Sequence, residues 1–151
     1  MLLSRLKTRG FTLLELMVVI AIISILASLS APIFTRQIAK AKLIEVQNLA
    51  TQHQSLVEEF ILVNGDFPST AEFDLIKRSL PESSIVKTLA VENQNEGSGN
   101  IRLTLNSDTG VSEGQYFLYS RDDDRNWNCT SDLDSKLLPS QCINLVNGAG
   151  E

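Results

Sequence analysis

The most constraining feature of this sequence is an uninterrupted apolar run from Phe11 to Phe34. At about 1.5 Å of rise per residue, its 24 residues form a helix long enough to cross the hydrocarbon core of a bilayer. Glu15 is the only ionisable side chain between Phe11 and Thr35. A carboxylate within a membrane helix costs about 2.5–3.5 kcal/mol on insertion scales, so by default it marks a functional site that needs a partner. The run therefore predicts a membrane anchor with a further role at Glu15.

The flanks of the run predict its orientation. Arg5, Lys7 and Arg9 precede it and an acidic domain follows it, so the positive-inside rule puts the N-terminus in the cytoplasm and the C-terminus outside. The alternative is a secretion signal cleaved near residues 27–31. The apolar core of such a signal is typically only about 7–15 residues long, so we expect a retained, single-pass helix.

An amphipathic helix is predicted to continue the anchor through residues 35–64. Apolar residues and one histidine recur there mainly at spacings of three and four, which indicates one buried stripe: Ile38, Ala41, Val46, Leu49, His53, Leu56, Phe60 and Val63. We expect His53 to pack at the edge of a helix–sheet core. Asn64-Gly65 supplies the stop signal, because glycine accepts the left-handed conformation beyond a helix end. Pro32 lacks an amide donor and is expected to bend or loosen the helix near residues 28–32 without ending it.

The rest of the chain, residues 65–151, is predicted to form a globular head of α+β class. Residues 65–83 read as a connecting loop with a short helix over Thr70–Leu80, which begins at the capping box Ser69–Glu72. Three strand-like segments follow in residues 84–128: Ile85–Val91, Ile101–Leu105 and Gln115–Ser120. The separators 93–100 and 106–114 are rich in Gly, Asn, Ser and Asp, as turns are. We therefore expect a small antiparallel sheet packed on the helix stripe.

The two cysteines, Cys129 and Cys142, lie in the polar C-terminal quarter of the chain. Two cysteines in an exported domain most often pair, and here they would bound a loop over residues 129–142. Closing a loop of this size stabilises the fold by about 3 kcal/mol in the chain-entropy estimate.

Charge and composition disfavour several functions. The formal net charge is −5, and the part from Phe11 onward carries 10 basic and 18 acidic residues. This acidic balance would repel a phosphate backbone, so DNA binding is not expected. With His53 as the only histidine, a multi-histidine metal site is excluded and no catalytic nucleophile–base set can be assembled. The acidic residues Asp122–Asp124, Asp132 and Asp134 read as solvated charge in preference to a calcium site.

The sequence Gly10 to Ile23, GFTLLELMVVIAII, resembles the start of a type IV prepilin, with its short basic leader, glycine before phenylalanine and glutamate five positions later. Pro32 matches the helix-breaking proline of that family. Trp127-Asn128-Cys129 and Leu138-Pro139-Ser140-Gln141-Cys142 resemble the two ends of the disulfide-bounded loop of type IVa pilins. Ser24 stands where the family often has glycine, and Gln52 stands at the position of a second proline that many pilins carry.

The resemblance implies that residues 1–10 are a cytoplasmic leader. A prepilin peptidase would cut between Gly10 and Phe11 and methylate the new amine of Phe11. The implied fold is the type IV pilin fold, with residues 11–34 as the membrane and filament-core helix. The subunit would need no cofactor and catalyse nothing, leaving the inner membrane for an extracellular pilus built of identical subunits. The implied machinery comprises a platform protein, assembly and retraction ATPases and a secretin.

Glu15 and Phe11 are the predicted assembly residues. A neighbouring subunit's Phe11 amine would neutralise the Glu15 carboxylate and fix the axial register, and low dielectric would strengthen the pair. Pairing within one chain is the alternative. The expected functions of such a pilus are adhesion, twitching motility and DNA uptake. Two alternatives remain: a type II secretion pseudopilin, and a minor pilin acting as an adhesin or DNA receptor.

Overall fold

A computed structural model describes residues 10–107 and 110–145. The basic residues Arg5, Lys7 and Arg9, with most of the predicted leader, lie outside this range. The chain divides into two compact units, with the boundary between Thr35 and Arg36.

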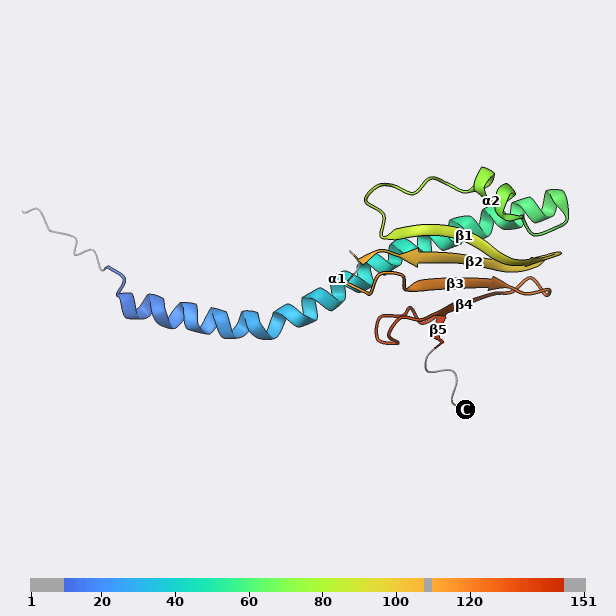
Figure 1. Ribbon diagram of the computed structural model, residues 1–151. Helices are drawn as coiled ribbons and strands as arrows, with labels where there is room; N and C mark the ends of the chain where they lie inside the picture. Colours follow the sequence, from blue (N-terminus) through green and yellow to red (C-terminus); the bar gives the residue numbers. More distant parts are fainter. Residues whose placement is uncertain (1–9, 108–109, 146–151) are drawn as a thin grey trace, which may run out of the picture. The chain divides into compact units, whose positions relative to one another are not determined.

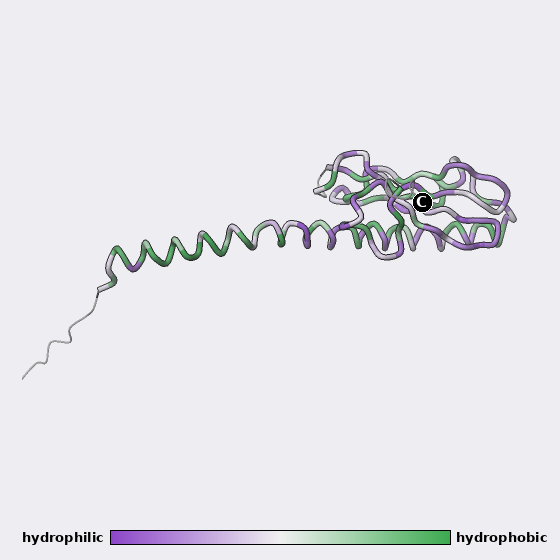
Figure 2. Tube along the Cα trace, turned by 90° about the horizontal axis from the view of Figure 1, so that it is seen from below, coloured by the Kyte–Doolittle hydropathy of each residue, from purple (hydrophilic) through white to green (hydrophobic). Residues whose placement is uncertain are grey.

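Helix α1 (Leu13–Asn64) is continuous over 52 residues and contains Pro32. It ends where the sequence predicts, because Gly65 has a φ of +92° and donates its amide to the Ile61 carbonyl at 2.8 Å. Figure 2 shows the hydrophobic colouring that runs along the first half of this helix. Residues 10–38 are all exposed within the chain, as expected of a segment that is surrounded by lipid or by another subunit. The bend predicted at Pro32 stays a prediction.

The head unit packs the second half of α1 against a five-stranded sheet of order β1-β2-β3-β4-β5 (Figure 1). Its strands are β1 (Val86–Asn95), β2 (Ser98–Leu105), β3 (Tyr116–Arg121), β4 (Trp127–Ser131) and β5 (Cys142–Asn144). Neighbours from β1 to β4 are antiparallel, which confirms the α+β prediction. The short β5 pairs parallel to β4. Neither β4 nor β5 is among the three strands that the sequence predicts, and the sheet therefore extends beyond the expected residues 84–128.

Two local predictions differ from the structure in extent. The turn expected over residues 93–100 is mostly strand, because β1 and β2 form a tight hairpin that pairs Asn95 with Ser98. The short helix α2 (Thr70–Ile76) begins at the predicted capping box on Ser69, but it stops before Lys77, whose backbone is extended.

The buried stripe of α1 was predicted in the wrong register. Only Val46 and His53 of the predicted set are fully buried, whereas Ile38 is 47% exposed. The buried stripe is Ala39, Leu43, Val46, Ala50, His53 and Val57. Leu49, Leu56 and Phe60 are only partly buried, and Val63 is exposed. Spacings of three and four fit neighbouring faces of one helix, and packing in the head selects between them.

The inner face of the sheet supplies the rest of the core. Alternate residues of β2 and β3 are buried, and Ile101, Leu103 and Phe117 are fully buried. Gly99 lies against the ring of Phe67: a Cβ added at Gly99 would come within 2.7 Å of that ring. A side chain at this position would therefore force the Phe67 ring to move.

Candidate assembly site and its supporting head

The N-terminal motif forms a reciprocal hydrogen-bonded cap at the start of α1. The backbone amide and the hydroxyl of Thr12 each donate to Glu15 Oε2 at 2.8 Å. The Glu15 amide donates in return to Thr12 Oγ1 at 3.2 Å. This is a capping box, in which a threonine and a glutamate three residues apart satisfy two free amides of the first helical turn. The negative Glu15 also lies at the positive end of the helix dipole.

Phe11 and Gly10 lie directly before this cap. Phe11 is 86% exposed, and Gly10 has no atom within 4 Å of the place where a Cβ would stand. The dipeptide is therefore accessible within the chain. Thr12 is the site residue that sequence reasoning missed, although the same Thr/Ser-x-x-Glu spacing was used to predict the box at Ser69.

Hydroxyl groups in the anchor bond to the helix that carries them. Ser24 donates to the Ile20 carbonyl at 2.7 Å, and Ser30 donates to the Leu26 carbonyl at 2.6 Å. Ser28 donates to the Ile25 carbonyl at 2.7 Å. These bonds satisfy the hydroxyls inside an apolar segment, where an unpaired polar group would be costly. Helix α1 has the length and composition to cross a membrane, and its most apolar window is wholly exposed within the chain.

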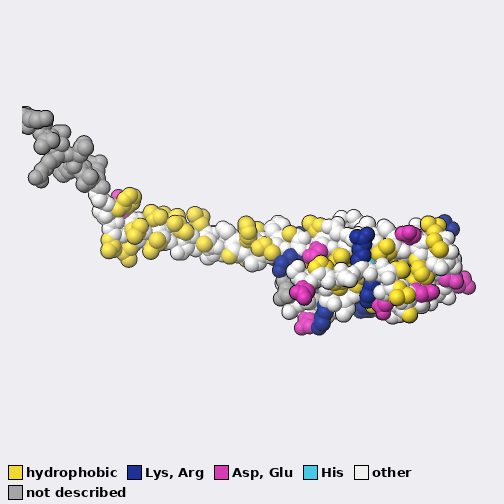
Figure 3. All heavy atoms as spheres, turned by 90° about the horizontal axis from the view of Figure 1, so that it is seen from above, with side chains coloured by type: hydrophobic (Ala, Val, Ile, Leu, Met, Phe, Trp, Pro, Cys, Tyr) yellow, Lys and Arg dark blue, Asp and Glu magenta, His cyan; other side chains and the backbone are white. Residues whose placement is uncertain are grey.

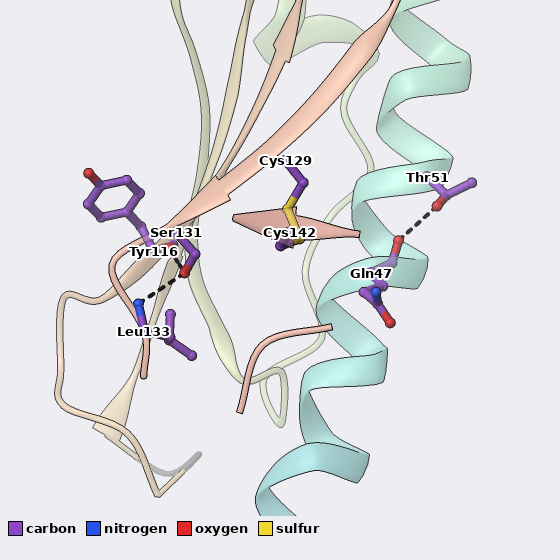
Figure 4. Close-up of a disulfide and its surroundings, with 7 residues drawn as sticks. All are labelled: Gln47, Thr51, Tyr116, Cys129, Ser131, Leu133 and Cys142. Atoms are coloured by element: carbon purple, nitrogen blue, oxygen red, sulfur yellow. Dashed lines mark hydrogen bonds between the residues drawn. A yellow bond between two sulfur atoms is a disulfide. The ribbon is translucent and has the colours of Figure 1, made fainter. Parts of the chain in front are cut away.

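The disulfide predicted from the sequence joins Cys129 of β4 to Cys142 of β5, with the two Cα atoms 4.5 Å apart (Figure 4). The two cysteines are also register partners in the parallel pair. Between them, Leu133 is fully buried, and its amide donates to Ser131 Oγ at 3.2 Å. The Ser131 hydroxyl in turn donates to the Tyr116 carbonyl at 2.7 Å. The loop is thus held to the sheet by a covalent bond, a core leucine and a buried hydroxyl.

A second glutamate of α1, Glu58, ties the helix to the sheet. Arg121 donates to its two carboxylate oxygens, from Nε at 2.7 Å and from Nη2 at 3.0 Å, and Trp127 Nε1 donates at 2.8 Å. The third nitrogen of Arg121 donates to the Gly97 carbonyl in the β1–β2 turn. Hydrogen bonds from Arg121 lower the pKa of Glu58, and the Glu58 carboxylate raises the pKa of Arg121. The Arg121 side chain is only 4% exposed, so its charge depends on this pairing.

Three of the acidic residues considered for calcium accept hydrogen bonds from backbone amides. Asp122 Oδ1 accepts the Asn126 amide at 2.7 Å, and Asp132 Oδ1 accepts the Tyr116 amide at 2.8 Å. Asp134 Oδ1 accepts the Lys136 amide at 2.8 Å. Within residues 10–107 and 110–145, no group of three His, Cys, Asp or Glu side chains is placed to hold a metal ion.

The fold and the N-terminal motif define a class of protein: an exposed apolar helix with one carboxylate near its start, joined to an α+β head with a C-terminal disulfide. Family comparison matches residues 39–143 to the family described as pilin of the bacterial filament. It matches residues 5–31 to the prokaryotic N-terminal methylation motif.

Among similar proteins, the fimbrial protein EcpC of Eikenella corrodens is 34% identical, over 90% of this chain and 91% of its own. The type IV major pilin protein PilE1 of Neisseria gonorrhoeae is 31% identical, over 89% of this chain and 86% of its own. The type IV major fimbrial protein FimA of Dichelobacter nodosus is 26% identical, over 89% and 95% respectively.

The chain belongs to the pilin family and is a type IV pilin, a structural subunit of a pilus. The pilin family is structural, and its subunits assemble into filaments. The secretion pseudopilin and the minor-pilin receptor are not favoured over this assignment.

Proposed function

We propose that this chain is the repeating subunit of an extracellular pilus that assembles from the inner membrane. In the proposal, α1 first spans the membrane once with its N-terminus in the cytoplasm. A prepilin peptidase removes residues 1–10 and methylates Phe11, and the subunit then joins identical copies. A platform protein, an assembly ATPase and a secretin are the expected partners, and adhesion, twitching motility and DNA uptake are the expected uses.

One observation carries the proposed assembly chemistry: Glu15 is the only ionisable side chain in the apolar segment, and it lies four residues after Phe11 in the first turn of α1. Cleavage before Phe11 would create a positive amine close to the carboxylate. The hydrogen bonds between Glu15 and Thr12 join residues three positions apart, so they can form in an isolated subunit. We propose that the Phe11 amine of an adjacent subunit pairs with Glu15 as the helices pack together. Charge pairing and apolar packing would then favour the same docked position.

The proposal is tested by Glu15→Ala, with Glu72→Ala as the matched control. Both glutamates close a capping box on a hydroxyl residue three positions earlier, but Glu72 lies in the head. We expect Glu15→Ala to be cleaved and inserted normally and to give filaments reduced about tenfold or more, because an unpaired amine would remain in a low-dielectric core. Glu72→Ala should assemble normally.

The measurements are immunoblotting of the processed subunit and electron microscopy of sheared filaments. Normal piliation by Glu15→Ala would refute the pairing mechanism. Mass spectrometry of the sheared filaments tests processing, where a dominant methylated species of residues 11–151 with one disulfide is the expected result.

A further inference from the structure

His53, the only histidine of the chain, is completely buried on the inner face of α1. Its ring connects three segments of the head. Nδ1 lies 2.6 Å from the Leu49 carbonyl of the same helix, and Nε2 lies 3.3 Å from the Arg78 amide just beyond α2. The ring also packs on Phe73 of α2, with the ring centres 6.0 Å apart.

These contacts define the protonation state of the ring. The Leu49 oxygen is an acceptor, so Nδ1 must carry the hydrogen. The Arg78 nitrogen is a donor, so Nε2 must present its lone pair. Only the neutral imidazole with its hydrogen on Nδ1 satisfies both partners. A second proton would put an N–H group of the ring against the N–H group of Arg78.

The charges around His53 also oppose a second proton. Lys77 and Arg78 flank the ring from the segment after α2, and burial together with these two cations lowers the pKa of His53. Asp74 of α2 is bound to Lys77 at 2.6 Å, and Lys87 of β1 is bound to Glu113 at 2.6 Å. The charges that act on His53 are thus those of Lys77 and Arg78, and Lys77 is itself paired with Asp74.

From this geometry we propose that His53 is an acid-sensitive latch between α1 and the segment after α2. At neutral pH, its Nε2 accepts the Arg78 amide and holds residues 77–84 against the helix. In acid, a proton from solvent binds Nε2, the bond to Arg78 is lost, and the segment opens so that the imidazolium reaches water. The change is reversible and leaves the sheet and the disulfide intact. It concerns the head alone and is independent of pairing at Glu15.

The direct test is hydrogen exchange at the Arg78 amide in the full mature chain held in detergent micelles. After correction for the intrinsic pH dependence of exchange, we expect protection at Arg78 to fall about tenfold or more between pH 7.5 and pH 5. Protection in the centres of β2 and β3 should change little. Equal protection of Arg78 at the two pH values would overturn the latch.

Variants separate the latch from general acid destabilisation. His53→Gln keeps a side-chain acceptor for the Arg78 amide but cannot titrate, so its Arg78 protection should be independent of pH. Arg78→Gln keeps the backbone amide but removes one cation that lowers the closed-state pKa of His53, so it should reduce the acid-induced loss of protection, whereas the matched control Lys136→Gln should not. A His53→Gln chain that loses protection in acid as the parent does would refute the role of the ring.

A spectroscopic measurement on the parent protein requires no variant. Because the chain has one histidine, ¹⁵N-labelled histidine gives one pair of ring signals. We expect a neutral ring with its hydrogen on Nδ1 at pH 7.5, and protonation coincident with the loss of Arg78 protection. A ring that is already charged at neutral pH, or has its hydrogen on Nε2, would contradict the proposal.

Discussion

Two glutamates of the same helix show how differently the anchor and the head are stabilised. Glu15 is bonded to Thr12, three residues away, whereas Glu58 is bonded to Arg121 and Trp127, which are 63 and 69 residues away. Bonding between near neighbours in the sequence is typical of the whole anchor. The side-chain hydrogen bonds shown by the structure in residues 10–35 all join residues three or four positions apart.

This difference follows from what surrounds each unit. A helix satisfies its backbone internally and can stand alone in lipid, and its hydroxyls bond to the preceding turn. The head must bury apolar area in water, and it does so by bringing distant segments together. Figure 3 shows charged and hydrophobic side chains mixed on the surface of the head. The anchor therefore keeps its apolar surface exposed along its length, whereas the inner face of the sheet in the head is already buried.

The largest expected contrast is between two leucines, one from each unit. Leu103 is fully buried in β2 and Leu26 is 59% exposed in the anchor. Leu103→Ala should lower the free energy of unfolding of the head by about 2–5 kcal/mol through lost burial and a cavity. Leu26→Ala should change it by less than about 0.5 kcal/mol. Denaturation in detergent followed by Trp127 fluorescence reports on the head alone, and similar losses from the two variants would invalidate the separation of the units.

Reduction of the Cys129–Cys142 disulfide should have the next largest effect. Removing the cross-link frees the chain in the unfolded state and leaves β5 attached to the sheet through only three register pairs. The free energy of unfolding of the head should fall by about 3 kcal/mol. The helical signal of the anchor in circular dichroism should remain. Calorimetry with and without reductant makes the measurement, and an unchanged melting temperature would show that the loop is held without the cross-link.

Glu58→Ala should destabilise the head by about 2 kcal/mol, which is below the 3–5 kcal/mol typical of fully buried pairs because the Glu58 side chain is 36% exposed. The adjacent and exposed Glu59 is the control, with an expected loss below about 0.5 kcal/mol for Glu59→Ala. Thermal unfolding by calorimetry distinguishes the two.

The pH dependence of Glu58 has a definite sign. Its folded-state pKa is lowered from 4.5, so its pairing stabilises the head above about pH 4.5. That contribution should disappear as the pH falls through the folded-state pKa. In Glu58→Ala this part of the acid dependence should be missing, and an acid profile identical to the parent's would contradict the assignment. The acid range of Glu58 lies below that expected for His53.

The sequence by itself determined the features that depend on neighbouring residues. These are the apolar helix around Glu15, the stop at Gly65, the capping box at Ser69 and the alternation that predicts strands β2 and β3. It also predicted the pairing of Cys129 with Cys142 and, by resemblance, the pilin family. Each follows from local chemistry or from a short motif, so no knowledge of the tertiary fold was needed.

The tertiary structure alone decided the features that join distant segments. It selected which stripe of α1 is buried in the head, because close packing depends on how side chains fit together as well as on their apolar character. It added the parallel strand β5, whose three residues carry no recognisable strand pattern. It brought Glu58 to Arg121, and His53 to the Arg78 amide. The periodicity of the sequence does not predict such contacts, because the residues that meet are 63 positions apart for Glu58 and Arg121 and 25 positions apart for His53 and Arg78.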